Sequence, residues 1–151
     1  MKRSSRFSVA LHVLVHLAER PGEAATSGLL AACVGTNPVV VRRTLAGLRE
    51  AGLVRSTGGH GGGWSLARDA GAVTLRDVYA ALGERLLLAV DPALREDGCP
   101  VERAVSGTLD HFLDDAEALL AARLARITVA DLAADVRALA CRLPHETRED
   151  R

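Results

Sequence analysis

The segment TNPVVVRR, residues 36–43, decides how this chain is expected to fold. Asn37 is a favourable N-cap, and Pro38 suits the first helical position because its missing amide proton would have no partner there. A helix from Pro38 to about Gly52 then carries apolar side chains at helical spacing, which are expected to face a core: Val41, Leu45 and Leu48. Arg42 and Arg43 follow Val41 directly and are therefore expected to flank the exposed surface of this helix.

The segments before it predict two further helices. Phe7 to Ala18 has apolar residues at helical spacing, and Pro21-Gly22 ends that helix. Thr26 or Ser27 can cap a short second helix, which Gly35 ends.

The segments after it predict a β-hairpin. Residues 53–56 and 64–66 have strand character on either side of a glycine-rich tip at 58–63. This order of elements is the winged helix-turn-helix arrangement: a helix, a short helix, a tight turn, a third helix and a hairpin. In it the third helix enters the major groove of DNA. The chain is therefore expected to be mainly α-helical with a small β-hairpin wing.

Three more helices are expected downstream. Thr74 and Asp77 form a capping-box pattern at the start of one, and Pro100 can open a long helix that runs to about Ala125. Thr128, with Asp131 at the N3 position, can cap the last. The residues expected to be buried are Leu75, Val78 and Leu82 in the first of these helices and Leu132, Val136 and Leu139 in the last.

Charge is distributed unevenly along the chain, although its formal sum is zero. Residues 1–68 hold nine basic and three acidic side chains, a net charge of +6, whereas residues 69–151 hold ten basic and 16 acidic, a net charge of −6. A basic N-terminal half favours a polyanion as partner. Aromatic residues make up only 3% of the chain, which argues against a single-strand-binding surface built on base stacking.

Other function classes find little support. No nucleophile–base motif, phosphate-binding loop or dinucleotide fingerprint is present, so the chain is not expected to be an enzyme. No apolar run reaches the roughly 18 residues of a membrane span. His12 and His16 interrupt the apolar stretch near the N-terminus, and we expect a cytoplasmic protein without a membrane partner. The same two histidines have a metal-compatible spacing, but no local ligand completes a site and no metal is expected.

The candidate DNA-binding surface follows from this arrangement. Arginine can donate two hydrogen bonds to guanine or contact phosphate. An isolated arginine pair is usually only a solvated helix face, but the wing and the basic half favour DNA here. The candidate residues are Arg6, Thr36, Asn37, Val39, Arg42, Arg43, His60 and Gly61.

Five segments, in order, resemble the Rrf2 family of bacterial transcription regulators: RFSVAL (6–11), LAGLREAGLV (45–54), GGGWSL (61–66), VTLRDV (73–78) and ITVADL (127–132). The resemblance implies a homodimer in which the long helix crosses its partner, and a repressor that binds a palindromic double-stranded operator. The residues expected at the dimer contact are Val101, Val105, Leu109, Phe112, Ala116 and Leu119. The expected organisation is a winged-helix domain at 1–83, a connecting or sensor loop at 84–99, dimerisation helices at 100–143 and a flexible tail at 144–151.

The sequence departs from this family in two places. Many relatives hold an iron–sulfur cluster with three cysteines before the long helix, whereas this segment has Cys99 alone. We therefore expect no cofactor, although Glu96, Asp97 or His12 could in principle supply other ligands. Relatives often carry an arginine early in the wing, where this chain has Gly58 and Gly59; Arg55 or His60 are the available substitutes.

The three cysteines suggest control by oxidation. Cys99 precedes Pro100, where the helix dipole favours a thiolate. Some cluster-free relatives are thiol sensors, so we expect oxidation of Cys99, by disulfide formation with Cys33 of the partner subunit, to release DNA. Cys33 is alternatively expected to be a small apolar residue packed in the core, and Cys99 an incidental loop thiol. Cys141 is expected to be a packing residue.

Two other functions stay open at this point. One is an iron–sulfur or metal sensor on the same fold, which uses Cys99 with non-cysteine ligands. The other is an adaptor whose winged helix binds protein instead of DNA. The effector is left open between an oxidant and a small molecule.

Overall fold

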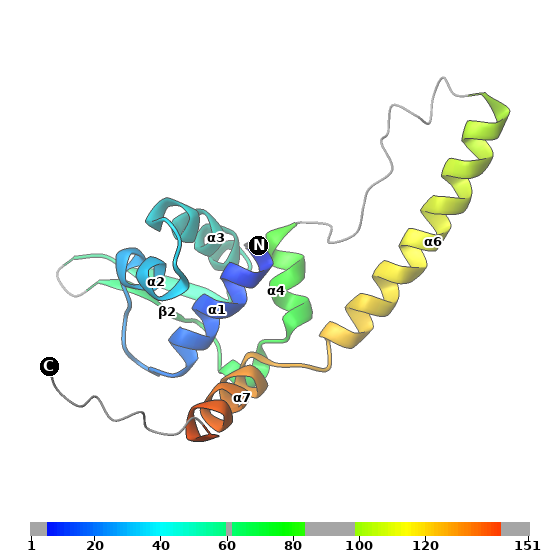
Figure 1. Ribbon diagram of the computed structural model, residues 1–151. Helices are drawn as coiled ribbons and strands as arrows, with labels where there is room; N and C mark the ends of the chain where they lie inside the picture. The colour runs from blue at the N-terminus through cyan, green and yellow to red at the C-terminus, as the bar shows by residue number, and fades with distance from the viewer. Residues whose placement is uncertain (1–5, 60–61, 84–98, 143–151) are drawn as a thin grey trace, which may run out of the picture.

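The structure is a computed structural model that describes residues 6–59, 62–83 and 99–142. The N-terminal elements are α1 (Arg6–Ala18), α2 (Ser27–Val34), α3 (Pro38–Glu50), β1 (Val54–Thr57) and β2 (Gly63–Leu66). They are followed by the short 3-10 helix η1 (Ala70–Ala72), α4 (Leu75–Leu82), the long α6 (Pro100–Leu124) and α7 (Val129–Arg142). Figure 1 shows a compact winged-helix body from which α6 projects, while α7 returns beneath α1. The mainly helical fold with a hairpin wing is confirmed.

Helix α1 lies at the centre of the core. Its buried face consists of Val9, Ala10, Val13, Leu14 and Leu17. The inward residues of α3 (Val41, Leu45 and Leu48) are fully covered, as their spacing predicts. The same cluster includes Leu30 of α2, Val54 of β1, and Val73 and Val78 around the start of α4. Burial of this shared apolar surface holds α3 against the rest of the domain.

The expected caps set the geometry of the helix-turn-helix. The Thr26 side chain accepts a hydrogen bond from the Leu29 amide at 3.2 Å, and Asn37 Oδ1 accepts one from the Val39 amide at 2.8 Å. Between these helices Gly35 has φ +69°, a left-handed conformation that favours glycine at a helix end. The turn between α2 and α3 is therefore fixed by local contacts as well as by the core.

The wing is a two-stranded antiparallel hairpin that pairs with the segment just before α2. Its register runs from Val54 opposite Leu66 to Thr57 opposite Gly63. Trp64 exchanges backbone hydrogen bonds with Ala25 at 2.8 and 2.9 Å. A Cβ on Gly63 would lie 2.7 Å from the Ala25 carbonyl oxygen, so this close approach requires glycine.

Matching capping boxes begin α4 and α7. Thr74 and Asp77 hold the start of α4, and Thr128 and Asp131 hold the start of α7, each through side-chain-to-amide bonds of 2.9–3.1 Å in both directions. The Thr74 amide lowers the pKa of the Asp77 carboxyl below its usual value. The two helix starts lie side by side, because the Leu75 amide donates to the Ile127 carbonyl oxygen at 2.9 Å.

We expect replacement of Thr74 by alanine to lower the free energy of unfolding by about 1 kcal/mol, since it removes one N-cap oxygen. Chemical denaturation followed by circular dichroism measures this change. Thr108→Ala, on the exposed surface of α6, is the matched control and should change stability by less than about 0.5 kcal/mol. Equal loss in both variants would show that the capping box contributes nothing of its own.

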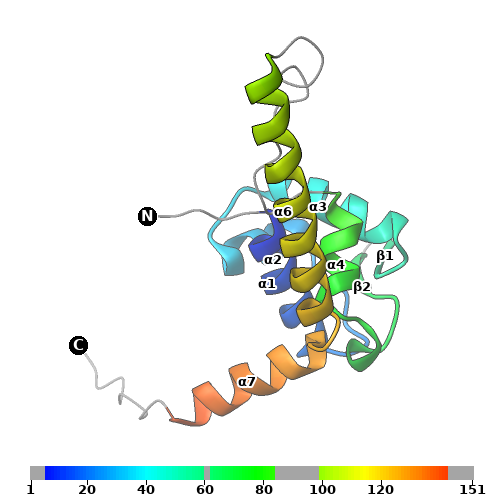
Figure 2. The same cartoon turned by 90° about the vertical axis from the view of Figure 1, so that its right-hand side faces the viewer.

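The expected burial of two apolar residues on the last helix is wrong. Val136 and Leu139 were expected to be buried, but Leu139 is 60% exposed and Val136 is also exposed. The buried residues of α7 are instead Val129 and Ala133. Helix α7 packs on α1 and η1 and then extends past them (Figures 1 and 2). Its later apolar residues therefore stay exposed in the part of the chain that the structure describes.

Cys141 is exposed near the end of α7, which corrects its expected role as a packing residue. The helix runs beyond its neighbours at this point, as it does at Leu139. Of the expected connecting loop at 84–99, residues 84–98 lie outside the described residues, as does the tail at 144–151. Within the described ranges, no helix is both long and apolar enough to span a membrane.

Candidate nucleic-acid interface

The exposed surface of α3 carries the residues expected to meet DNA. Val39 is 51% exposed on the first turn. Arg42 and Arg43 are exposed directly after the fully buried Val41, as their adjacency predicts. An α-helix that presents arginines beside a short apolar side chain has the donors and the width to enter a major groove.

The residues just before α3 have mainly structural contacts. Thr36 is half-buried, and its amide donates to the Ala31 carbonyl oxygen at 3.0 Å. Asn37 is exposed, but its Oδ1 already caps the helix. Its side-chain amide nitrogen is the donor that can still face a phosphate or a base. Both residues stay predictions as DNA contacts.

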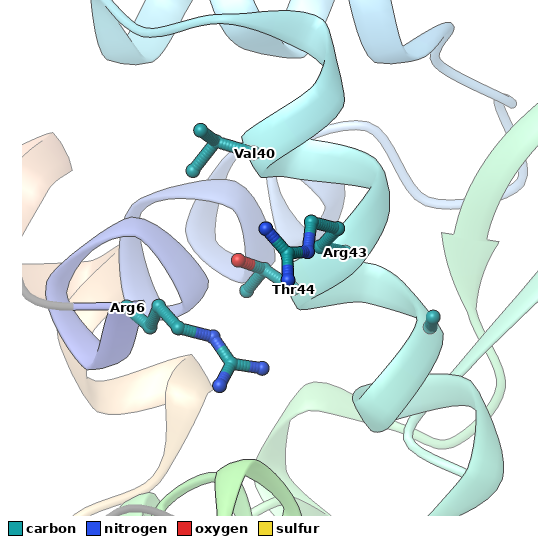
Figure 3. Close-up of a pocket in the computed structure, with 5 residues that line it drawn as sticks. Arg6, Val40, Arg43 and Thr44 are labelled. Atoms are coloured by element: carbon teal, nitrogen blue, oxygen red, sulfur yellow. The ribbon is translucent and has the colours of Figure 1, made fainter.

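Arg6 and Arg43 approach one another across a hollow between α1 and α3. The hollow has a volume of about 440 Å³ and is lined by Arg6, Val40, Arg43, Thr44 and Ala46. In Figure 3 the Arg6 side chain extends from α1 toward α3, and the Arg43 side chain lies along α3 beside Thr44. We call this the Arg6–Arg43 pocket. It brings the basic start of α1 onto the same side of the domain as the recognition helix.

Thr44 lines this pocket and was not singled out from the sequence. Its side chain is fully covered (0% exposed), yet Oγ1 has no hydrogen-bond partner within the described part of the chain. Burial of an unpaired hydroxyl costs stability. The signal was present in the sequence, because Thr44 is the one polar residue among the inward positions of α3.

Among the described residues, Arg55 is the arginine of the wing. Arg55 on β1 is exposed, and its Nε donates to Ser65 Oγ of β2 at 3.1 Å. This bond holds the arginine along the face of the hairpin. His60 and Gly61, the other wing candidates, lie outside the described residues.

The cysteines occupy three separate surfaces. Cys33 is exposed on α2, so its expected packing in the core is wrong. The short α2 buries only Leu30 and Ala31, and Cys33 lies on another side of the helix. Cys99 is exposed, as expected, and forms the N-cap of α6. Its backbone amide donates to Glu102 Oε2 at 3.1 Å, so this amide is already engaged.

Of the other candidate metal ligands, the structure describes His12 and His16, whereas Glu96 and Asp97 lie outside the described residues. The rings of His12 and His16 stack with centroids 5.1 Å apart. Burial, followed by the charge of His12, lowers the pKa of His16, which favours the neutral imidazole. In the described ranges no group of three or more His, Cys, Asp or Glu side chains is placed to hold a metal ion. The three thiols also lie on different elements, which does not fit the cysteine set of an iron–sulfur cluster.

Comparison with known proteins decides the family. Residues 3–135 match the family described as "Rrf2: Iron-dependent Transcriptional regulator". The chain belongs to the Rrf2 family. It is a DNA-binding transcriptional regulator and not an enzyme. The resemblance expected from the five sequence segments is thereby confirmed.

Individual relatives agree with this assignment. The chain is 30% identical over 129 residues to the HTH-type transcriptional regulator YwnA of Bacillus subtilis, covering 85% of this chain and 95% of that protein. A transcriptional regulator from Lactobacillus plantarum superposes with a TM-score of 0.71 at 28% identity, covering 87% of this chain and 89% of that one. The T. potens protein IscR superposes with a TM-score of 0.68 at 21% identity, covering 96% of this chain and 93% of that one, which supports the fold.

Proposed function

We propose that this Rrf2-family protein is a homodimeric repressor that binds a palindromic duplex operator and is released from it by oxidation. The proposal of a dimer rests on a continuous exposed apolar stripe along α6. Val101 is 70% exposed and Phe112 67% exposed, and Val105, Leu109 and Leu119 are also exposed. Ala116 is half-buried in the same row. We call these six residues the α6 stripe.

Helical geometry makes the α6 stripe a single surface. At 100° per residue the six side chains fall within an arc of about 80°. The charged residues Glu102, Asp110 and Glu117 lie outside this arc. A second copy of the same helix would cover the stripe and remove this apolar area from water.

A dimer with two-fold symmetry would favour an operator with palindromic symmetry. Two copies of α3, related by the dimer axis, would enter successive major grooves and favour a palindromic site. Val39, Arg42 and Arg43 are the proposed base-edge and phosphate contacts. Arg6, Thr36 and Asn37 are the proposed backbone contacts, and His60 and Gly61 the wing contacts. A repressor acts by occupying this site in a promoter.

Oxidation is proposed to act through the two exposed thiols. A peroxide oxidises the Cys99 thiolate to a sulfenic acid, and the thiol of Cys33 of the partner subunit then displaces water to form a disulfide. Two thiols and one peroxide give one disulfide and two waters. Cys33 lies on the helix-turn-helix, while Cys99 lies at the start of α6. A bond between them would change how the recognition helices are spaced.

Cys99→Ser is expected to abolish the effect of hydrogen peroxide on DNA binding. The measurement compares affinity for a duplex recovered from a random library by the wild-type protein, with and without peroxide. A non-reducing gel on the same samples should show a covalent dimer for the wild type and for the control Cys141→Ser, and none for Cys99→Ser. If Cys99→Ser releases DNA on oxidation as fully as the wild type does, the proposed switch is wrong.

A further inference from the structure

We infer that Val39 contacts the C5-methyl group of a thymine in the major groove and so helps to set the base preference of the protein. The inference deepens the proposed operator binding, on which it rests, because it names the base that the apolar centre of the α3 surface recognises. Three observations support it: the exposure of Val39, its place between two arginines, and the hydrogen bonds already made at the start of α3.

Val39 is an apolar residue on the outward side of an amphipathic helix. Its side chain is 51% exposed, whereas Val41, Leu45 and Leu48 of the same helix are 0% exposed. At 100° per residue Val39 lies about 180° from Leu48, so it points directly away from the core. Packing within the domain therefore does not account for a valine here, and a partner that covered it would remove its apolar surface from water.

The neighbours of Val39 indicate that this partner is DNA. Single exposed valines are common on protein surfaces, so the position matters more than the exposure. On the helical projection Arg42 lies about 60° to one side of Val39 and Arg43 about 40° to the other. Both arginines are exposed. A valine between two guanidinium groups suits the major groove, where the methyl group of thymine is the apolar feature that the base pairs present.

The start of α3 lacks the paired donor and acceptor that recognise an adenine. Asn37 Oδ1 accepts the Val39 amide at 2.8 Å, so Asn37 cannot offer a base its donor and acceptor together. The Val40 amide donates to the Asn37 carbonyl oxygen at 3.0 Å, and Pro38 has no amide proton. The 13 residues of α3 include no Asn or Gln. The contact that this helix can make to an A·T pair is therefore an apolar one, from Val39 to the thymine.

Deoxyuridine tests the contact directly, because uracil differs from thymine only in lacking the C5-methyl group. The duplex is the palindromic one selected by the wild-type protein. Each thymine of a half-site is replaced in turn, together with its symmetry mate in the other half-site. Loss of one buried methyl contact weakens binding roughly fourfold, so the paired replacement should weaken wild-type binding about 15-fold at one thymine position.

Val39→Ala removes the side-chain methyl groups and keeps a good helix former. The variant should bind the thymine duplex about 15-fold more weakly than the wild type, and it should bind the thymine and deoxyuridine duplexes equally. A merely structural loss would weaken binding to both duplexes by one factor and keep the difference between them. The matched control Val136→Ala makes the same change at an exposed site on α7 and should retain the affinity and the thymine preference of the wild type.

The outcomes separate this inference from the proposed operator binding. Loss of the thymine preference in Val39→Ala alone supports the contact. A wild type that binds the duplex but tolerates deoxyuridine at every thymine position overturns the contact and leaves operator binding in place. The same holds if Val39→Ala keeps the full preference at every position. A wild type without salt-dependent binding to any duplex overturns operator binding and the thymine contact together, and favours a protein partner for this surface.

Discussion

Phe112→Asp is expected to convert the protein from a dimer to a monomer. Phe112 lies at the middle of the α6 stripe and is 67% exposed in the single chain. In a two-fold dimer the substitution would place a carboxylate from each subunit in an apolar contact, where an unpaired charge costs several kcal/mol. A loss of roughly 4 kcal/mol of association free energy raises the dimer dissociation constant by about 1,000-fold or more.

Sedimentation at micromolar protein concentration measures this change. Ala118→Asp is the matched control, because it adds the same charge at an exposed position of α6 outside the stripe and should leave the dimer intact. The monomeric variant should also bind a palindromic duplex 100-fold or more weakly, on the order of the avidity lost when two linked sites become one. A Phe112→Asp protein that sediments as a dimer would show that the α6 stripe is not the contact.

Arg43→Ala is expected to produce the largest loss of DNA binding among single substitutions on α3. The loss should be about 1–3 kcal/mol for the selected operator if Arg43 contacts a guanine edge. If Arg43 contacts phosphate, binding should weaken by a similar factor for every sequence. Comparison of the selected duplex with a scrambled duplex of the same length separates the two cases.

Arg126→Ala serves as the control for loss of one positive charge. Its position after α6 places it outside the proposed interface, and its affinity for both duplexes should equal that of the wild type. Equal binding by Arg43→Ala and the wild type would remove Arg43 from the site.

Local signals in the sequence predicted the helix boundaries well. Asn37 with Pro38, Thr74 with Asp77, and Thr128 with Asp131 each form caps from residues no more than three positions apart. Such contacts depend on neighbours in the chain and not on the tertiary fold. The inward face of α3 was equally predictable, because it packs on the core along its whole length.

Burial was less predictable where a helix extends beyond its neighbours. Periodicity identifies the apolar side of α7, but it does not say how far along the helix a covering surface continues. Val136 and Leu139 are exposed for this reason. Cys33 differs in that α2 is apolar throughout, so the sequence does not show which side of this short helix faces the core.

The candidate site was predicted in part. The exposure of Arg42 and Arg43 followed from their position next to Val41. The pocket did not, because it depends on the packing of α1 against α3, which brings Arg6 toward Arg43. The sequence did not show that the Thr44 hydroxyl would lie buried without a partner among the described residues.

The most direct test is the salt dependence of duplex DNA binding by the reduced wild-type protein. Arg6, Arg42 and Arg43 in each of two subunits give about six phosphate contacts, and the slope of log affinity against log salt concentration should then be about −5. The account predicts this steep slope, together with tighter binding to a selected palindromic duplex than to a scrambled one. Weak binding that does not change with salt would contradict it and favour a winged helix that binds protein.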